Sequence, residues 1–194
     1  MNITQSIMEF REKTIKGKCI DLVPVKEDHL ARIVELRNQE KSRYFLNQPQ
    51  LLTFETQKEW YEKYAERNND IYWCIQNKNG IIVGTIRIYD ITEDSCNHGS
   101  FIIDESYAMG NPYALEAQII TLEFAFQELH VHKIINDNRI DNEKVSAISC
   151  KMGFHYEKEI EIHNVKYLRY VLEEKDINTN KYKLVLDKFM KRRL

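Results

Sequence analysis

The sequence contains 194 residues, of which 43% are hydrophobic and 30% are charged, with only six glycines and three prolines. This length predicts one domain whose core needs neither disulfides nor a metal, and this composition excludes disordered, collagen-like and low-complexity proteins. The 28 Lys and Arg residues face 30 Asp and Glu residues, which gives a formal charge of −2. Because no global basic field exists, a nucleic-acid partner is not expected.

The cysteine pattern bears on location and on metal binding. Cys19, Cys74, Cys96 and Cys150 include no C-x-x-C pair, so their spacing matches neither a zinc site nor a disulfide framework. The first 18 residues lack the apolar core of a signal peptide, and no segment approaches the roughly 20 apolar residues of a membrane span. We therefore expect a cytoplasmic protein with free thiols, no metal and no membrane partner.

The first half of the chain predicts a strand, two helices and then a β-rich region. Apolar residues alternate early and recur at helical spacing after Asp28, and the second helix carries an apolar stripe of Trp60, Tyr61 and Tyr64. The segment Asn77–Gly80 is a strong hairpin signal. The predicted elements are a strand at 18–25, helices at 30–37 and 56–67, and strands at 71–76, 81–91 and 97–104.

In the second half the apolar period changes from two to about 3.6 residues, which indicates a long amphipathic helix. Gly153 is expected to end the next helix. The predicted elements are helices at 114–129, at 142–152 and within 179–194, and strands at 131–135, 155–163 and 166–174.

These elements predict an α/β protein with three layers and a sheet of mixed strand directions. The expected organisation is an N-terminal extension over 1–16, one domain over 17–174 and a C-terminal helical extension over 175–194. The apolar face of that last helix offers a contact for a homodimer.

The loop before the long helix is a candidate anion site. It leads from a strand into a helix, where backbone N–H groups and the helix dipole favour a phosphate. Gly110 would let this backbone bend close to a ligand. An ordinary strand-to-helix connection is the alternative interpretation.

The segment Asn142–Phe154 (NEKVSAISCKMGF) resembles the N-x-x-S-x-x-x-x-x-K-x-G-F segment of the GNAT N-acetyltransferases. Ile103–Tyr107 (IDESY) is similar to the end of that superfamily's fourth strand, and the opening GKCIDLVPVKEDHL resembles the branch that acetylates ribosomal-protein N-termini. The resemblance covers residues 17–172. It implies the GNAT fold, a mixed but mostly antiparallel sheet whose fourth and fifth strands splay apart between flanking helices.

The resemblance also implies a co-substrate and a reaction. Acetyl-CoA would lie in the V-shaped gap between the splayed strands, and a primary amine would attack its thioester directly. The pantetheine would pair with backbone on the fourth strand, and the pyrophosphate would lie at the loop that enters the long helix. The cofactor-binding residues implied in this way are Ile102, Ile103, Met109, Gly110, Asn111, Tyr113, Ala114 and Asn142.

This chain departs from the family pattern at the phosphate loop. The family motif is [QR]-x-x-G-x-[GA], and its best alignment here is Met109–Ala114. Met109 replaces the anchoring Arg or Gln, and Pro112 replaces the expected glycine. Proline has no N–H, so one phosphate donor is lost. We expect weakened but surviving CoA binding.

The catalytic residues are less clearly indicated. Many relatives have a tyrosine seven residues after the motif Asn to protonate the CoA sulfur; here that position is Ser149, with Ser146 and Cys150 as backup donors. His98 titrates in the useful range and is the first candidate base, and the other candidate bases are Asp90 and Glu59. His130 and His132 fall on one strand face, but no third metal ligand is evident.

Three acceptor classes remain open. Arg37-Asn38 and Trp60-Tyr61 resemble a subgroup that acetylates nucleotide-linked amino sugars, with Gln57 in place of a His. A polyamine acceptor would need an acidic pocket, and the available acids are Asp28, Glu35, Glu40, Glu55 and Glu59. Protein N-termini are the third option. A catalytically weak or inactive GNAT-like module that binds CoA or a protein partner is the alternative function, and transfer of a longer acyl group is another.

Overall fold

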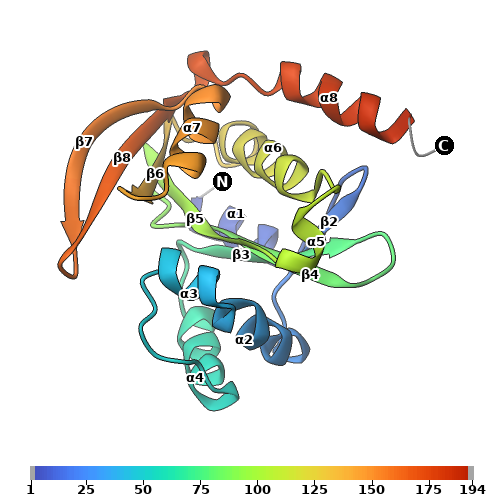
Figure 1. Cartoon of the computed structure of the whole chain (residues 1–194), viewed down its shortest axis with the longest axis vertical. Helices are drawn as coiled ribbons and strands as arrows, with labels where there is room; N and C mark the ends of the chain where they lie inside the picture. Colours follow the sequence, from blue (N-terminus) through green and yellow to red (C-terminus); the bar gives the residue numbers. More distant parts are fainter. Residues whose placement is uncertain (1–2, 192–194) are drawn as a thin grey trace.

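The structure is a computed structural model that describes residues 3–191. Its centre is an eight-stranded sheet in the order β1-β2-β3-β4-β5-β6-β8-β7 (Figure 1). Neighbouring strands are antiparallel except for the parallel pair β5 and β6. The strands are β1 (Ile15–Lys16), β2 (Ile20–Pro24), β3 (Ile71–Asn77), β4 (Ile82–Tyr89), β5 (Ser95–Ile103), β6 (Lys133–Arg139), β7 (His155–Ile162) and β8 (Val165–Glu173).

Helices cover both faces of the sheet and complete the three predicted layers. The main core lies on the face covered by α6, with α1 contributing Ile7 and Phe10, and a smaller core lies under α2 and α4 on the opposite face. The α-helices are α1 (Ile3–Phe10), α2 (Leu30–Asn38), α3 (Glu40–Phe45), α4 (Phe54–Ala65), α5 (Glu105–Ala108), α6 (Tyr113–Gln127), α7 (Glu143–Met152) and α8 (Asn180–Lys191).

The predicted fold class is confirmed, because the sheet is mixed, mostly antiparallel and flanked by helices. The short elements α3, α5 and β1 were not predicted. Residues 1–2 and 192–194 of the two predicted extensions lie outside the described residues. Among the helices described, none combines the length and the apolar character that crossing a membrane requires.

The C-terminal helix α8 packs along α6 (Figure 1). Leu186 is buried, whereas Leu184 and Val185 are largely exposed. The predicted apolar face is therefore only partly used inside the chain, and the homodimer stays a prediction.

The strands β5 and β6 pair over only three residues each and then diverge. Ser95–Asn97 pairs with Lys133–Ile135, after which β5 follows β4 and β6 follows β8. The predicted divergence of the family's fourth and fifth strands is thus confirmed, and β5 and β6 are that pair. Because the strands separate in mid-sheet, one flank of each is left without a strand neighbour.

A β-bulge interrupts β5 beside this divergence. Thr85 of β4 pairs with Ile102 and Arg87 pairs with Gly99, so two residues of β5 face one residue of β4. Ser100 in the bulge has φ 47°, and its carbonyl accepts a hydrogen bond of 3.2 Å from the Thr85 hydroxyl. The extra residue changes the direction in which the side chains of β5 point on either side of the bulge.

Candidate active site

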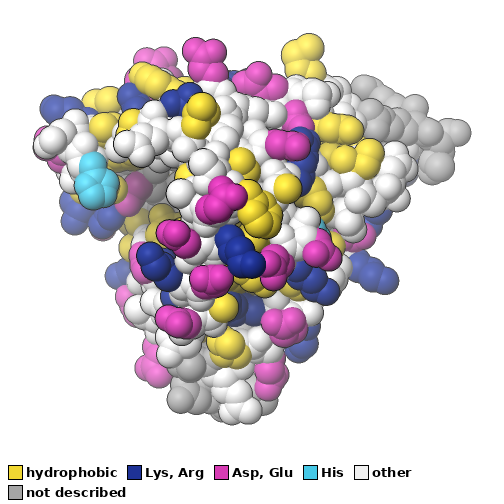
Figure 2. Space-filling model, turned by 90° about the horizontal axis from the view of Figure 1, so that it is seen from below, with side chains coloured by type: hydrophobic (Ala, Val, Ile, Leu, Met, Phe, Trp, Pro, Cys, Tyr) yellow, Lys and Arg dark blue, Asp and Glu magenta, His cyan; other side chains and the backbone are white. Residues whose placement is uncertain are grey.

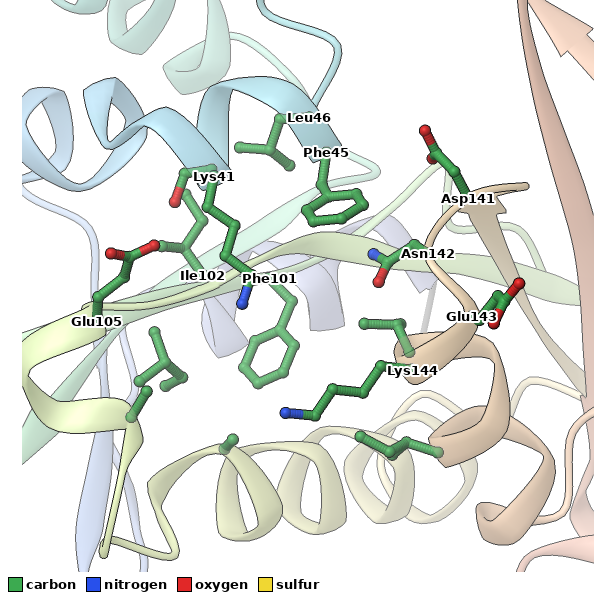
Figure 3. A pocket seen from close by; sticks show the side chains of 16 residues that line it. Lys41, Phe45, Leu46, Phe101, Ile102, Glu105, Asp141, Asn142, Glu143 and Lys144 are labelled. Carbon is green, nitrogen blue, oxygen red and sulfur yellow. The ribbon is translucent and has the colours of Figure 1, made fainter.

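A cavity of about 490 Å³ lies where β5 and β6 diverge. Residues 101–103 of β5 form one wall, and α3 and the beginnings of α6 and α7 form the others. Lys41 of α3 and Lys144 of α7 extend their amino groups into it from opposite walls, beside the ring of Phe101 (Figure 3). An elongated ligand in this cavity would contact backbone, apolar side chains and two cations.

The predicted cofactor-binding residues gather at this cavity. Four of them line it: Ile102, Ile103, Ala114 and Asn142. The other four lie between the lining residues Ala108 and Ala114, in the segment that leads into α6, and do not line the cavity themselves: Met109, Gly110, Asn111 and Tyr113. Met109 is 87% exposed, and its thioether has no N–H group with which to replace the donors of an anchoring Arg or Gln.

The segment that enters α6 directs backbone amides outward from the helix start. Gly110 adopts φ +73°, a left-handed conformation that glycine tolerates without strain. Pro112 is the N-cap, and its carbonyl accepts the helical hydrogen bond from the Glu116 amide at 2.9 Å. The amides of residues 113–115 come before the amide that makes this bond, so they have no acceptor within the helix, as at any helix start. Proline removes one of the four terminal donors, and three remain for an anion.

Asp104 fixes the start of this segment. Its carboxylate caps α5 by accepting hydrogen bonds from the Ser106 amide at 2.9 Å and the Ser106 hydroxyl at 2.7 Å, and it pairs with Arg32 of α2. Burial opposes the charged form, but these hydrogen bonds prevail and lower the pKa of Asp104 to about 2. The carboxylate therefore remains ionised at neutral pH and holds α5 against α2.

Ser149 lies on α7 and faces β6, and it does not line the cavity. Its hydroxyl donates to the Val145 carbonyl at 3.1 Å and accepts hydrogen bonds from the Asn136 and Asn138 amides, each at 3.3 Å. The hydroxyl proton that a catalytic acid would deliver is therefore already donated to the Val145 carbonyl. Its catalytic role stays a prediction.

The neighbouring candidate donors differ in exposure. Ser146 is buried with no hydrogen-bond partner for its hydroxyl among the described residues, and Cys150 is exposed.

His98 is buried between β5 and α6, away from the cavity. Its Nε2 lies 2.9 Å from the Thr121 hydroxyl, which itself donates to the Ala117 carbonyl. Burial lowers the pKa of His98 to about 4, so the ring is neutral at physiological pH. A catalytic role for His98 stays a prediction, and the geometry indicates a hydrogen-bonded core residue.

We expect His98 to make the fold sensitive to mild acid. An unfolded histidine takes up a proton near pH 6.5, whereas this one does so only near pH 4. Stability from the neutral ring is therefore complete above about pH 6.5 and falls as the pH drops toward 4. The loss between about pH 7.5 and pH 5 is about 2 kcal/mol. Urea unfolding at both pH values measures it.

The variant H98Q, which keeps a hydrogen-bonding group but does not titrate, should lose this pH dependence. H132Q serves as the control because His132 is exposed. Equal pH dependence in wild type and H98Q would contradict the assignment.

The remaining candidates from the sequence do not reach the cavity. Asp90 is exposed and accepts a hydrogen bond from the Asn97 side chain at 2.8 Å, and Glu59 is exposed on α4. His130 and His132 are also exposed. Among residues 3–191, no group of three or more His, Cys, Asp or Glu side chains is placed to hold a metal ion.

A second cavity, of about 200 Å³, is formed by α2, α4 and the adjoining strands. Its lining includes Arg37, Trp60, Tyr72 and Arg87, and no acidic residue. Ser100 of the bulge also lines it, whereas the next residue along β5 lines the first cavity. The two cavities are therefore neighbours on either side of the β5 bulge.

The comparisons with known proteins agree with this geometry. Residues 20–155 match the family model described as the acetyltransferase (GNAT) domain. This match spans more than half of the chain, so the protein belongs to the GNAT acetyltransferase family. No curated protein matches the sequence.

Solved structures with the same fold include two with named substrates. The apo structure of FdhC, a nucleotide-linked sugar GNAT, is 22% identical with a TM-score of 0.75, covering 91% of this chain and 98% of its own. Spermidine N-acetyltransferase from Vibrio cholerae, in complex with CoA and spermine, is 18% identical with a TM-score of 0.73, covering 82% and 98%. A GNAT-family acetyltransferase from Bacillus anthracis is 19% identical with a TM-score of 0.71, covering 84% and 99%. At these identities the likeness concerns the fold.

Proposed function

We propose that this protein transfers an acetyl group from acetyl-CoA to a primary amine, by direct attack of the amine on the thioester. The observation that carries the proposal is the cavity at the divergence of β5 and β6, which joins an unpaired strand flank to the start of α6. Family membership supports acetyl transfer in general. A cytoplasmic location is part of the proposal, since the four cysteines, all of them described, form no disulfide.

The residues around the cavity fit a long, phosphorylated thioester. The backbone of Ile102 and Ile103 would bind the pantetheine amides, because no strand among residues 3–191 pairs with them on that side. The amides of residues 113–115 would bind phosphate oxygens. Lys41 and Lys144 would add positive charge, and neither forms an ion pair with another described residue.

Acetyl-CoA would supply the acetyl group in an activated form. In the transfer, a neutral amine forms the new C–N bond to the acetyl carbon, the C–S bond breaks, and the sulfur takes up a proton as the nitrogen loses one. Ser149 and His98 do not line the cavity. Three carboxylates line it, and Asp141 is already bound by Arg139 and Tyr44. We therefore assign proton removal to water relayed by the other two, Glu105 and Glu143.

Cofactor binding is the first expected result. Acetyl-CoA at 100 times its dissociation constant should stabilise the fold by about 2.7 kcal/mol, a rise in Tm of several degrees. The variant K144M should bind acetyl-CoA severalfold more weakly, whereas K151M on the same helix should match the wild type. Thermal unfolding and calorimetry measure both effects. No shift with millimolar acetyl-CoA would refute the proposal.

A catalytically weak or inactive module that binds CoA is the second candidate function. It is favoured by the Ser149 hydroxyl, whose hydrogen bonds run to α7 and β6 instead of the cavity. An assay of CoA release across primary amines separates the two. Cofactor binding without turnover of any amine would favour the module.

A further inference from the structure

We propose that the acceptor amine carries an anionic oxygen group, a phosphate ester or a carboxylate, which Arg37 binds in the second cavity. This inference rests on the proposed function, because it names the substrate class of that transfer. The second cavity would then be the acceptor subsite. The amine would reach the acetyl group past the β5 bulge, which separates the two cavities.

The charges around this cavity are unbalanced. Arg37 and Arg87 both line it, and no carboxylate does. The charge of Arg87 is balanced by a buried carboxylate outside the cavity lining. Its Nε lies 2.7 Å from an oxygen of Asp70, and Asp70 is 1% exposed. Arg37 has no such partner among the described residues. Its Nε donates a hydrogen bond of 3.1 Å to the Gln48 amide oxygen, and its other polar neighbour is the Tyr72 side chain; both groups are neutral.

A guanidinium in a small cavity gains from an anion. Its planar, forked N–H groups match carboxylate and phosphate oxygens, and the pair is stronger in a partly desolvated site than in open water. Because the other arginine is already paired, an anion in this cavity would be bound mainly by Arg37.

Two further polar side chains of the same cavity are buried. Tyr72 is 2% exposed, and its hydroxyl has no hydrogen-bond partner among the described residues. Gln57 of α4 is 4% exposed. A buried hydroxyl without a partner is costly, so it is readily explained as a donor to a ligand. Both groups can donate to an oxyanion.

The position of the cavity suits an acceptor site. Ser100 lines it and Phe101 lines the cofactor cavity, so one residue step along the bulge separates the two. An acceptor anchored through its anion by Arg37 would extend its amine toward the cofactor cavity.

The same charges disfavour a polyamine. The five acids considered for a polyamine pocket are exposed and line neither cavity: Asp28, Glu35, Glu40, Glu55 and Glu59. Figure 2 shows acidic and basic side chains interspersed on the face of the molecule seen from below, without an acid-rich patch. The charge of Arg37, which no carboxylate in the cavity balances, would repel a diamine.

The test compares three series of primary amines with two to five methylene groups: ω-amino alkyl phosphates, amino alcohols of the same length, and diamines. Release of CoA gives kcat/KM for each compound. Calorimetry in the presence of CoA gives binding of the same compounds without turnover. The variants are R37Q, R37K as a milder change that keeps the charge, and K63Q, which removes one exposed charge from α4.

At one or more lengths, the phosphate should exceed the matching alcohol by about tenfold or more in kcat/KM and in affinity. R37Q should reduce the ratio to near one, R37K should give an intermediate ratio, and K63Q should keep the wild-type ratio. Equal use of phosphates and alcohols, or a preference for diamines, would overturn the inference while leaving the proposed function intact. Cofactor binding with phosphate binding but no turnover would instead refute the transfer and keep the anion site.

Discussion

Replacing Asp70 with alanine is expected to lower the free energy of unfolding by about 3–5 kcal/mol, because the partly buried guanidinium of Arg87 would lose its carboxylate partner. Asp70 lies just before β3 and is 1% exposed. One of its oxygens contacts Arg87 Nε at 2.7 Å, and the other contacts Arg87 Nη2 and Arg67 Nη1, the latter at 3.1 Å. The arginines also lie over the Trp60 ring. One carboxylate therefore connects the turn that follows α4, the start of β3 and β4.

Urea unfolding of D70A and of the control E59A measures this effect. Glu59 is exposed on α4, so E59A should change the free energy of unfolding by well under about 1 kcal/mol. Similar losses in the two variants would show that the buried ion pair contributes little. D70N is informative too, since it keeps the shape and removes the charge.

Replacing Glu116 with alanine is expected to cost a similar amount, about 3–5 kcal/mol. Glu116 lies in the first turn of α6 and is 2% exposed. Its carboxylate accepts hydrogen bonds from three consecutive amides before and within β2: Lys18, Cys19 at 2.7 Å and Ile20 at 3.0 Å. Removal of the carboxylate would leave these amides without an acceptor in a dry environment.

The conservative variant E116Q keeps one acceptor oxygen and should recover part of the lost stability. E128A at the C-terminal end of the same helix is the matched control, because Glu128 is exposed. Chemical unfolding monitored by circular dichroism distinguishes them. Retention of wild-type stability by E116A would mean that water replaces the carboxylate.

The parts of the fold that were predictable have strong local signals. The segment Asn142–Phe154 predicted α7 and its end, and Gly153 indeed adopts φ +108° there. A Cβ at Gly153 would lie 2.0 Å from the Asp176 carbonyl, so this glycine is needed by local conformation and by packing alike. The apolar periods likewise located α4, α6 and the strands to within a few residues.

The parts that were missed depend on distant contacts. Helix α3 is short and polar, and residues 41–46 form a cavity wall without any apolar period that would predict it. Glu116 is indistinguishable in sequence from an exposed helical charge until the chain before β2 supplies its three donors. The burial of His98 against Thr121 of α6 likewise has no local signal in the sequence.

The second cavity could not be predicted from the sequence, because it depends on the register of β3 against β4. The register of the Gln76–Ile82 pair beside the turn, continued along both strands, would place Tyr72 opposite Ile86. The irregularity between Ile75 and Gln76 shifts the register, so Tyr72 pairs with Arg87 instead. That shift brings the phenol and the guanidinium together beside Arg37, and nothing in the local sequence indicates it.

The divergence of β5 and β6 gives the sheet two interior edges in addition to its outer ones. An edge strand normally invites pairing with another chain, but here α3 and the start of α7 line the opening. A narrow co-substrate can reach the exposed flank of β5, whereas the strand of another molecule cannot. Amide hydrogen exchange along residues 98–103 should therefore be fast on that flank in the free protein, and a ligand that completes the sheet should slow it there more than anywhere in β3 or β4.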